Sequence, residues 1–210
     1  FHNEVSNSDL LRNLNQIRKE RKMNKNKVEF GTSNFHIGVY EIDEHGAAKL
    51  GPSMAVPGMR ALSLDADSEE SKFFADDVVY YSDFNDNGMT GELNMALFPD
   101  AFKTAFLNFK EMADGGIAQI KGGISKKVYF AFEGKGDKNR RRHIFFNASL
   151  GAIKREHKTI EEGKEVEEET LPITVTGDNK TGVIKISYAE GDTGYETVFS
   201  APTIPAVKNE

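Results

Sequence analysis

The chain lacks cysteine and tryptophan altogether and has only six prolines among its 210 residues. Without cysteine it has no disulfide, no thiolate metal site and no cysteine nucleophile. No stretch approaches the roughly 20 apolar residues of a membrane-spanning helix. The first residues also lack the order of a signal peptide, a basic segment followed by an apolar one. We therefore expect no membrane partner and no export by that route.

Familiar catalytic motifs are missing as well. The five histidines are scattered, and none has the i, i+4 spacing beside a glutamate that is typical of zinc hydrolases. No serine stands in a G-x-S-x-G turn. Asp76 and Asp77 are adjacent on a predicted strand or turn, where neighbouring side chains face opposite ways, so they make a poor catalytic pair. The sequence predicts no enzyme, no catalytic residue and no cofactor.

The charge is moderately acidic. Thirty-three acidic residues outnumber 27 basic ones, which gives a net charge of −6. A general nucleic-acid binder would normally be basic, so this balance argues against one. The length fits one domain with appendages, and a body of this size buries roughly 70% of its unfolded surface.

The clearest strand pattern lies between Met89 and Phe98. Apolar residues occupy alternate positions from Met89 to Leu97, and Thr90, Glu92, Asn94 and Ala96 lie between them. This period of two predicts a strand with one buried and one wetted face. Asn87-Gly88 just before it predicts a tight hairpin turn, because both residues accept positive φ.

A helix is predicted directly after this strand. Pro99 and Asp100 favour a helix start, because proline is preset for the first turn and an acidic residue complements the dipole. Phe102, Phe106 and Phe109 then follow at i, i+4 and i+7 and form an aromatic ridge on one face. We expect this ridge to pack on a β-sheet.

Most of the remaining chain also has strand character. Further strands are predicted at residues 35–42, 54–57, 61–64, 78–81, 127–133, 144–146, 171–175 and 183–188, the last two as a hairpin around Gly177-Asp178-Asn179. The fold class is therefore mainly β: an antiparallel β-sandwich or barrel with one main flanking α-helix.

The termini differ from the body in composition. Residues 1–22 carry a narrow leucine stripe and form an N-terminal extension, and Met23 is a candidate for the natural start. Residues 23–190 form the β domain, in which the glutamate-rich segment 154–170 predicts a solvated loop. Residues 191–210, with two prolines, predict an arm outside the core.

Two polar motifs have competing interpretations. Asp83, Asn85 and Asn87 copy the first half of a calcium loop, but Asn94 stands where a bidentate glutamate is needed, so a polar turn is the better interpretation. The arginine run Arg140, Arg141 and Arg142 would bind either phosphate or an acidic surface on another subunit, such as residues 161–169. We favour the second.

Several segments together resemble one family, the major tail proteins of long-tailed phages of Gram-positive bacteria. The matching segments are NKVEFGTSNFHIGVY (26–40), VPGMRALSLDADSEES (56–71), FFADDVVYY (73–81), NGMTGELNMALFPDAF (87–102), FAFEGKGDKNRRRHIFFNA (130–148) and TLPITVTG (170–177). They cover most of the chain from Met23. The extension at 1–22 and the segment SLGAIKRE after Asn147 depart from the family pattern.

The resemblance implies a tail tube subunit, in which six copies form a ring and stacked rings form a hollow tube. DNA would pass through it during ejection without specific binding. The implied partners are further copies, a tape-measure protein, a tail terminator and distal tail or baseplate proteins. The implied location is the virion tail, with assembly in the host cytoplasm.

Residue roles follow from this implied assembly. Glu92 and Glu133 are candidate lumen-facing acids, because negative charge on the wall would repel phosphate. The 65–88 segment and both termini are expected to bridge neighbouring rings. The candidate inter-subunit residues are Phe73, Tyr80, Tyr81, Arg140, Arg141 and Arg142. The alternative is a ligand- or carbohydrate-binding β-sandwich on a phage or cell surface, which would need exposed aromatic platforms or a complete ligand set.

Overall fold

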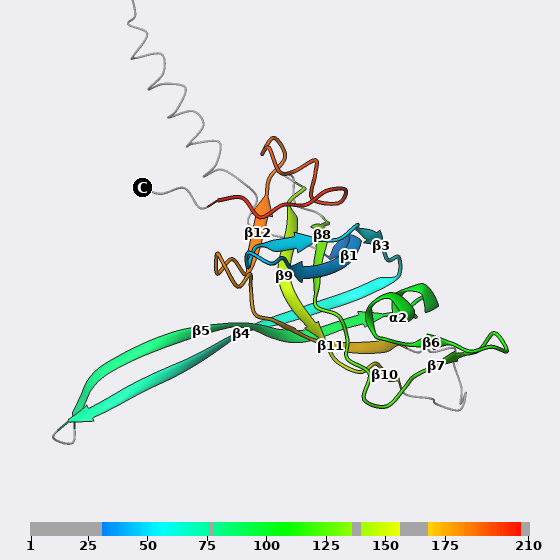
Figure 1. Ribbon diagram of the computed structural model, residues 1–210. Helices are drawn as coiled ribbons and strands as arrows, with labels where there is room; N and C mark the ends of the chain where they lie inside the picture. The colour runs from blue at the N-terminus through cyan, green and yellow to red at the C-terminus, as the bar shows by residue number, and fades with distance from the viewer. Residues whose placement is uncertain (1–30, 76–77, 136–139, 156–167, 207–210) are drawn as a thin grey trace, which may run out of the picture.

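The computed structural model describes residues 31–75, 78–135, 140–155 and 168–206. Within residues 69–85 it describes the backbone and not the side chains. The predicted N-terminal extension at 1–22 and most of the glutamate-rich segment 154–170 lie outside these residues. The described part is mainly β, with antiparallel pairing throughout and one helix, α2 (Asp100–Phe106). The predicted fold class is confirmed (Figure 1).

The strands, in chain order, are β1 (Thr32–Ile42), β2 (Ala48–Leu50), β3 (Met54–Ala55), β4 (Met59–Ala75), β5 (Val78–Met95), β6 (Lys110–Glu111), β7 (Ile117–Ala118), β8 (Val128–Gly134), β9 (Arg142–Leu150), β10 (Lys154–Arg155), β11 (Glu169–Val175) and β12 (Lys185–Tyr188). The main sheet has the order β2-β1-β8-β9-β11-β5-β4. The strands β3, β10 and β12 pair with β1, β11 and β9, and β6 pairs with β7 separately. The sheet curls on itself, since β1 and β4 come into contact although they are far apart in this order.

The predicted turn at Asn87-Gly88 is wrong. β5 runs straight through these residues, and β4 pairs with it from Met59 to Ala75. Gly88 does have positive φ, but it lies where the register shifts, so the pair forms a β-bulge in a long strand. A bulge and a hairpin turn both use positive φ, which is why the local sequence did not separate them.

The main core lies inside the curl and confirms the alternation of β5. Leu93 and Met95 are fully buried, whereas Thr90 and Glu92 on the opposite side are exposed. Phe102 and Phe106 of α2 are buried in the same cluster, so the aromatic face of the helix does pack on the sheet. Phe109 lies beyond the end of α2 but still packs against this cluster.

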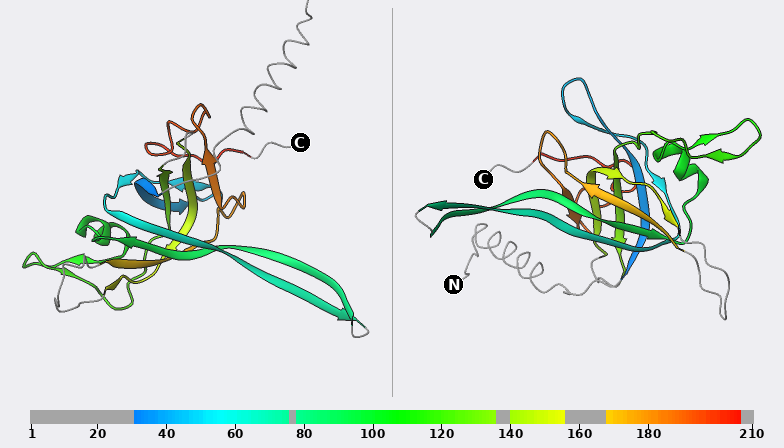
Figure 2. Two further views of the ribbon diagram at one scale, coloured as in Figure 1. Left: turned by 180° about the vertical axis from the view of Figure 1, so that it is seen from behind. Right: turned by 90° about the horizontal axis from the view of Figure 1, so that it is seen from below.

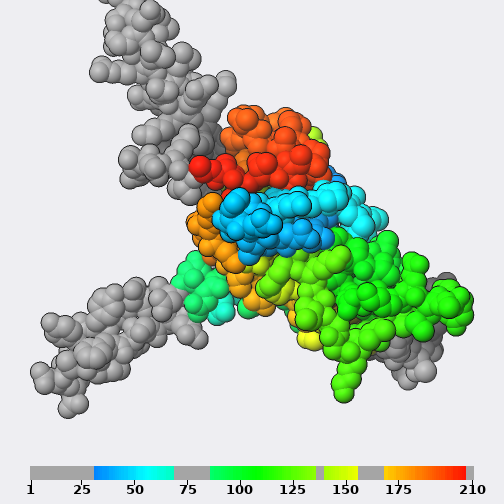
Figure 3. Space-filling model, in the orientation of Figure 1, coloured from blue at the N-terminus to red at the C-terminus, as the bar shows by residue number. Residues whose placement is uncertain are grey.

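A second core covers the other face of β1, β8 and β9. It contains Tyr129, Ile144 and Phe146 from the sheet together with Val198 from the C-terminal segment. Residues 191–206 therefore do not form an arm outside the core, as predicted; they cover the sheet, with Val198 only 2% exposed (Figures 1 and 3). Because β8 has a core on each side, all but one of its seven residues are buried.

The last two strands also differ from the prediction. β11 and β12 do not pair with each other as a hairpin. Instead both pair with β9, with β11 along residues 148–150 and β12 along residues 142–145. The turn between them is tied to the body, because the Tyr40 hydroxyl donates to Asp178 Oδ1 at 2.7 Å.

Glu169 shows that the acidic segment is not solvated throughout. It begins β11 and is only 4% exposed. Its Oε2 accepts a 2.7 Å hydrogen bond from the backbone N–H of Phe98, and Arg155 and Lys103 approach its Oε1 at 3.5 and 3.8 Å. This carboxylate fixes the chain immediately before α2. In the described ranges, no helix is long and apolar enough to span a membrane.

Candidate functional site

The β4–β5 hairpin extends far beyond the body (Figures 1 and 2). The pairing of β11 with β5 ends at Val175 and Met89. From Ser68 opposite Asp86 outward to Ala75 opposite Val78, β4 and β5 pair only with each other. We call this outer part, residues 68–75 and 78–86, the ribbon. An isolated two-stranded hairpin is marginally stable in water, so a ribbon of this length gains from a partner.

The hairpin also concentrates the negative charge. Residues 65–88 contain eight acidic residues and one lysine, a net charge of −7, whereas the whole chain carries −6. The rest of the protein is therefore close to neutral. By sequence, the outer end is apolar and aromatic, with Phe73, Phe74, Val78, Val79, Tyr80 and Tyr81. Phe73 is paired with Tyr81 in the register, so three predicted inter-subunit residues lie in the ribbon.

The ribbon geometry is unsuited to the calcium interpretation. Asp83, Asn85 and Asn87 all lie in β5. Alternate positions of a strand are roughly 6.6 Å apart along it, so an extended backbone does not wrap around one ion as a calcium loop does. The alternative interpretation, a polar turn, is also wrong here, because the strand continues. Among the described residues, no group of three or more acidic, histidine or cysteine side chains could hold a metal.

The arginine run meets an acid of its own chain. Arg140 Nε and Arg142 Nε lie 3.2 and 3.3 Å from the two carboxylate oxygens of Glu133. Glu133 is only 8% exposed. The hydrogen bond and the charge of Glu133 raise the pKa of Arg140 above its ordinary value. Glu133 thus differs from the exposed lumen acid that the sequence suggested, because two guanidinium groups neutralise it.

Arg142 is further fixed by the C-terminal segment. Its guanidinium carbon lies 3.8 Å from the centre of the Tyr195 ring and 4.8 Å from that of Phe199. Its Nη1 also donates a 2.6 Å hydrogen bond to the backbone carbonyl of Tyr195. With a side chain only 15% exposed, Arg142 offers little to another subunit. Arg140 is 66% exposed and remains accessible.

Glu92 is placed differently from Glu133. It lies on the wetted side of β5, with its side chain 50% exposed, and Lys154 Nζ approaches its Oε1 at 3.3 Å. An exposed pair of this kind is worth little and leaves the carboxylate in contact with solvent. Glu92 is therefore the better placed of the two predicted lumen acids.

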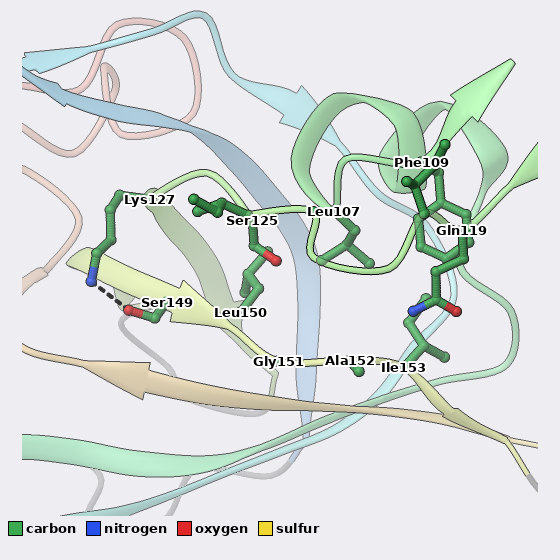
Figure 4. A pocket seen from close by; sticks show the side chains of 13 residues that line it. Leu107, Phe109, Gln119, Ser125, Lys127, Ser149, Leu150, Gly151, Ala152 and Ile153 are labelled. Carbon is green, nitrogen blue, oxygen red and sulfur yellow. Dashed lines mark hydrogen bonds between the residues drawn. The ribbon is translucent and has the colours of Figure 1, made fainter.

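A groove of about 460 Å³ lies between the segment 107–127 and the end of β9 (Figure 4). Leu107, Phe109 and Ile120 line one side, and Leu150 and Ile153 line the other. Lys127 lies at one end, where its amine donates a hydrogen bond to the Ser149 hydroxyl. Apolar and polar groups both line the groove, and the polar groups contribute the larger share of its surface.

The segment 107–127 exposes an unusual amount of apolar surface. Met112, Ile117, Ile120 and Ile124 are 50%, 36%, 51% and 86% exposed. The segment stands out from the body (Figure 3). Contiguous exposed apolar surface commonly marks an interaction site. The signal in the sequence was four large apolar residues in a segment without a strand or helix period to bury them.

Comparisons with known proteins give a limited result. No protein-family model matches the chain, and no curated protein sequence does. Solved structures that resemble it include the anti-feeding prophage cap, described as a tube terminating cap, at 10% identity over 80% of this chain and 97% of that one. Another is the sheath–tube complex of the extracellular contractile injection system PVC, at 13% identity over 77% of this chain and 94% of that one. A third is the sheath/tube terminator of the same system, at 12% identity over 78% of this chain and 99% of that one. The TM-score is 0.39 in each case, too low to carry an argument.

Proposed function

We propose that this chain is the structural subunit of a phage tail tube. Six copies form a ring, and rings stack into a hollow conduit through which DNA passes during ejection. The role is structural and not enzymatic. The combination of sequence motifs that resembles major tail proteins supports the proposal, and so does a mainly β body with one helix packed on the sheet.

The observation that carries the proposal is the β4–β5 ribbon. Among the described residues its strands pair with each other and with no third strand, and it projects away from the body. An extension of this length needs contacts with another molecule to stay ordered. Repeated copies of the same chain supply such contacts in a ring or stack, because a projection on one copy can meet a different surface of the next.

The net charge of −6 is compatible with a conduit for DNA. A chain that is not basic overall has no general attraction for phosphate, so DNA would pass without being retained. In this proposal Glu92 faces the lumen and Arg140 lies at a contact between subunits. The further partners are a tape-measure protein that fills the tube, a tail terminator and distal tail proteins. The location is the virion tail, after assembly in the host cytoplasm.

Sedimentation velocity of the full chain and of a variant that lacks the ribbon tests the proposal. Ala66 and Met89 are opposite each other in the register, so residues 67–88 can be replaced by Asn-Gly, which closes a two-residue hairpin. The pairing of β4, β5 and β11 inside this point remains. The full chain should form six-subunit or larger species, and the shortened variant should stay monomeric. Far-ultraviolet circular dichroism should show that the shortened variant keeps the β-sheet signal of the body. A full chain that remains monomeric at all concentrations would contradict the proposal.

No observation on the described residues specifically favours the alternative of a surface-binding β-sandwich. It would need exposed aromatic platforms, and the large apolar side chains exposed among the described residues are isoleucine, leucine and methionine. We therefore propose only the tail tube function.

A further inference from the structure

We propose that the groove beside the segment 107–127 is the docking site for the β4–β5 ribbon of a second copy of this chain. The inference rests on the proposed function and specifies which two surfaces meet. It assigns a role to a groove and an exposed apolar segment that the tube proposal leaves unused. The reasons are the positions of the two surfaces, their charges and the large apolar side chains that the segment 107–127 exposes.

The two surfaces lie at opposite ends of the molecule. In each of the three ribbon views the β4–β5 hairpin points away from the body on one side, and β6, β7 and their neighbouring loops lie on the other (Figures 1 and 2). One chain cannot therefore place its own ribbon in its own groove. A contact between different surfaces of successive copies is heterologous, and repetition of such a contact closes a ring or extends a filament.

The charges of the two surfaces are opposite. The segment 65–88 carries −7, and Asp65, Asp67 and Asp86 at its base are exposed. Residues 107–127, which supply one side of the groove, contain four lysines and two acidic residues, a net charge of +2, and Lys127 lines the groove itself. Lys110, Lys121 and Lys126 are exposed there. In a protein that is otherwise near neutral, this complementarity favours a second copy over an uncharged partner.

The segment beside the groove has exposed apolar area to bury. The groove is lined by Leu107, Phe109, Ile120, Leu150 and Ile153, and Ile124 beside it is 86% exposed. The ribbon, by sequence, ends in aromatic and β-branched residues on both strands. Apolar contact would supply affinity, and the surrounding charges would set which copy binds and in what orientation.

Mixed disulfide trapping tests this contact, and the absence of native cysteine makes each introduced thiol unique. Two single-cysteine proteins, Ile124→Cys and Ala75→Cys, are mixed under the conditions that give assemblies and are oxidised. A third protein, Ser200→Cys, places the thiol at an exposed site in the C-terminal segment and serves as the control. We expect the 124–75 heterodimer to exceed the 124–200 heterodimer at least fivefold.

A charge reversal separates the specific contact from random collision. Lys121→Glu with Lys126→Glu should reduce the 124–75 product at least threefold. Lys49→Glu with Lys180→Glu changes the net charge equally at exposed positions that do not line the groove, and should leave the product unchanged. Assemblies without the 124–75 product would overturn this inference and leave the tube proposal standing. Absence of assemblies at every concentration would contradict both.

The competing occupant of the groove is the N-terminal segment of the same chain. This occupant is tested by disulfide trapping in a protein that carries both Asn13→Cys and Ile124→Cys. An intramolecular 13–124 disulfide formed in place of the intermolecular 124–75 product would overturn the inference.

Discussion

Arg142 and Glu133 form the ion pair that ties the C-terminal segment to the sheet. Arg142 Nε lies 3.3 Å from Glu133 Oε2, and Arg142 also donates to the carbonyl of Tyr195 and stacks on its ring. One side chain thus joins β8, β9 and residues 195–199, which cover the second core. The arginine run, expected to serve contacts between subunits, has at least one member with a structural role within the chain.

Replacement of Arg142 should therefore destabilise the fold much more than replacement of Arg140. Arg142→Ala leaves Glu133 nearly buried with one exposed partner and removes the stack on Tyr195, so the free energy of unfolding should fall by about 3 kcal/mol. Arg140→Ala removes a pair whose arginine is 66% exposed and should cost much less. Urea unfolding of both variants measures the difference. Equal losses would show that Arg142 has no special role.

Gly91 is predicted to be irreplaceable in the packed part of the sheet. A Cβ at this position would clash with the backbone carbonyl oxygen of Ser63 on β4. Because that oxygen belongs to a paired strand, it cannot move away freely, and Gly91→Ala should cost at least about 2 kcal/mol. Thr90→Ala, at the exposed neighbouring position, should change stability by less than about 0.5 kcal/mol. Thermal unfolding compares the two, and a neutral Gly91→Ala would disprove the close approach.

The packing of α2 on the sheet can be tested by replacing Phe102. This ring is fully buried and stacks on Phe98 at 5.0 Å between centroids. Phe102→Ala should reduce the free energy of unfolding by about 3–5 kcal/mol, because it removes the buried ring and leaves a cavity. Leu97→Ala, at a site 53% exposed, should be close to neutral. Similar stabilities in guanidinium titrations would contradict the described packing.

The Tyr40–Asp178 hydrogen bond predicts a loss of stability at alkaline pH. Burial, with a further contribution from the hydrogen bond to Asp178, raises the pKa of Tyr40 from 10.0 to about 12. Between these values the folded protein keeps a proton that the unfolded chain has released, so stability falls as pH rises through that interval. The difference in free energy of unfolding between wild type and Tyr40→Phe should therefore shrink from pH 9.5 to pH 12. A constant difference would contradict the raised pKa.

Asp178 has the opposite behaviour at acid pH. Burial alone would raise its pKa, but hydrogen bonds from Thr181 and from the Tyr40 hydroxyl outweigh burial and lower it below 3.8. Its contribution is present above the ordinary aspartate pKa and is lost as pH falls through the folded value. Asp178→Asn should accordingly lower stability at pH 6 by more than it does at pH 2, as measured by urea unfolding. An equal effect at both pH values would contradict the lowered pKa.

Features set by local pattern were predictable from the sequence. The alternation from Met89 to Met95 and the helix start at Pro99-Asp100 needed only the period and the first residues of each element. Gly88 was assigned to a turn because a turn and a bulge place the same demand on φ. Its actual role depends on β4, whose pairing extends through this position.

Features set by distant partners were not predictable in the same way. Glu169 belongs to an acidic run, and its burial depends on distant partners such as the N–H of Phe98, 71 residues away, which no local pattern reveals. Tyr195 and Val198 lie in a segment without any period, so their burial follows from the face of β1 and β8 that they cover. The groove likewise joins residues 107–127 to 149–153, which no local pattern connects.

Negative-stain electron microscopy of the purified protein tests the central claim most directly. The samples are the full chain and a version that starts at Met23, each across a range of salt and protein concentrations. The account predicts six-fold rings or hollow tubes in at least one of them, with fewer assemblies at high salt, because the proposed contact is partly electrostatic. Uniform monomers in both samples under every condition would contradict it.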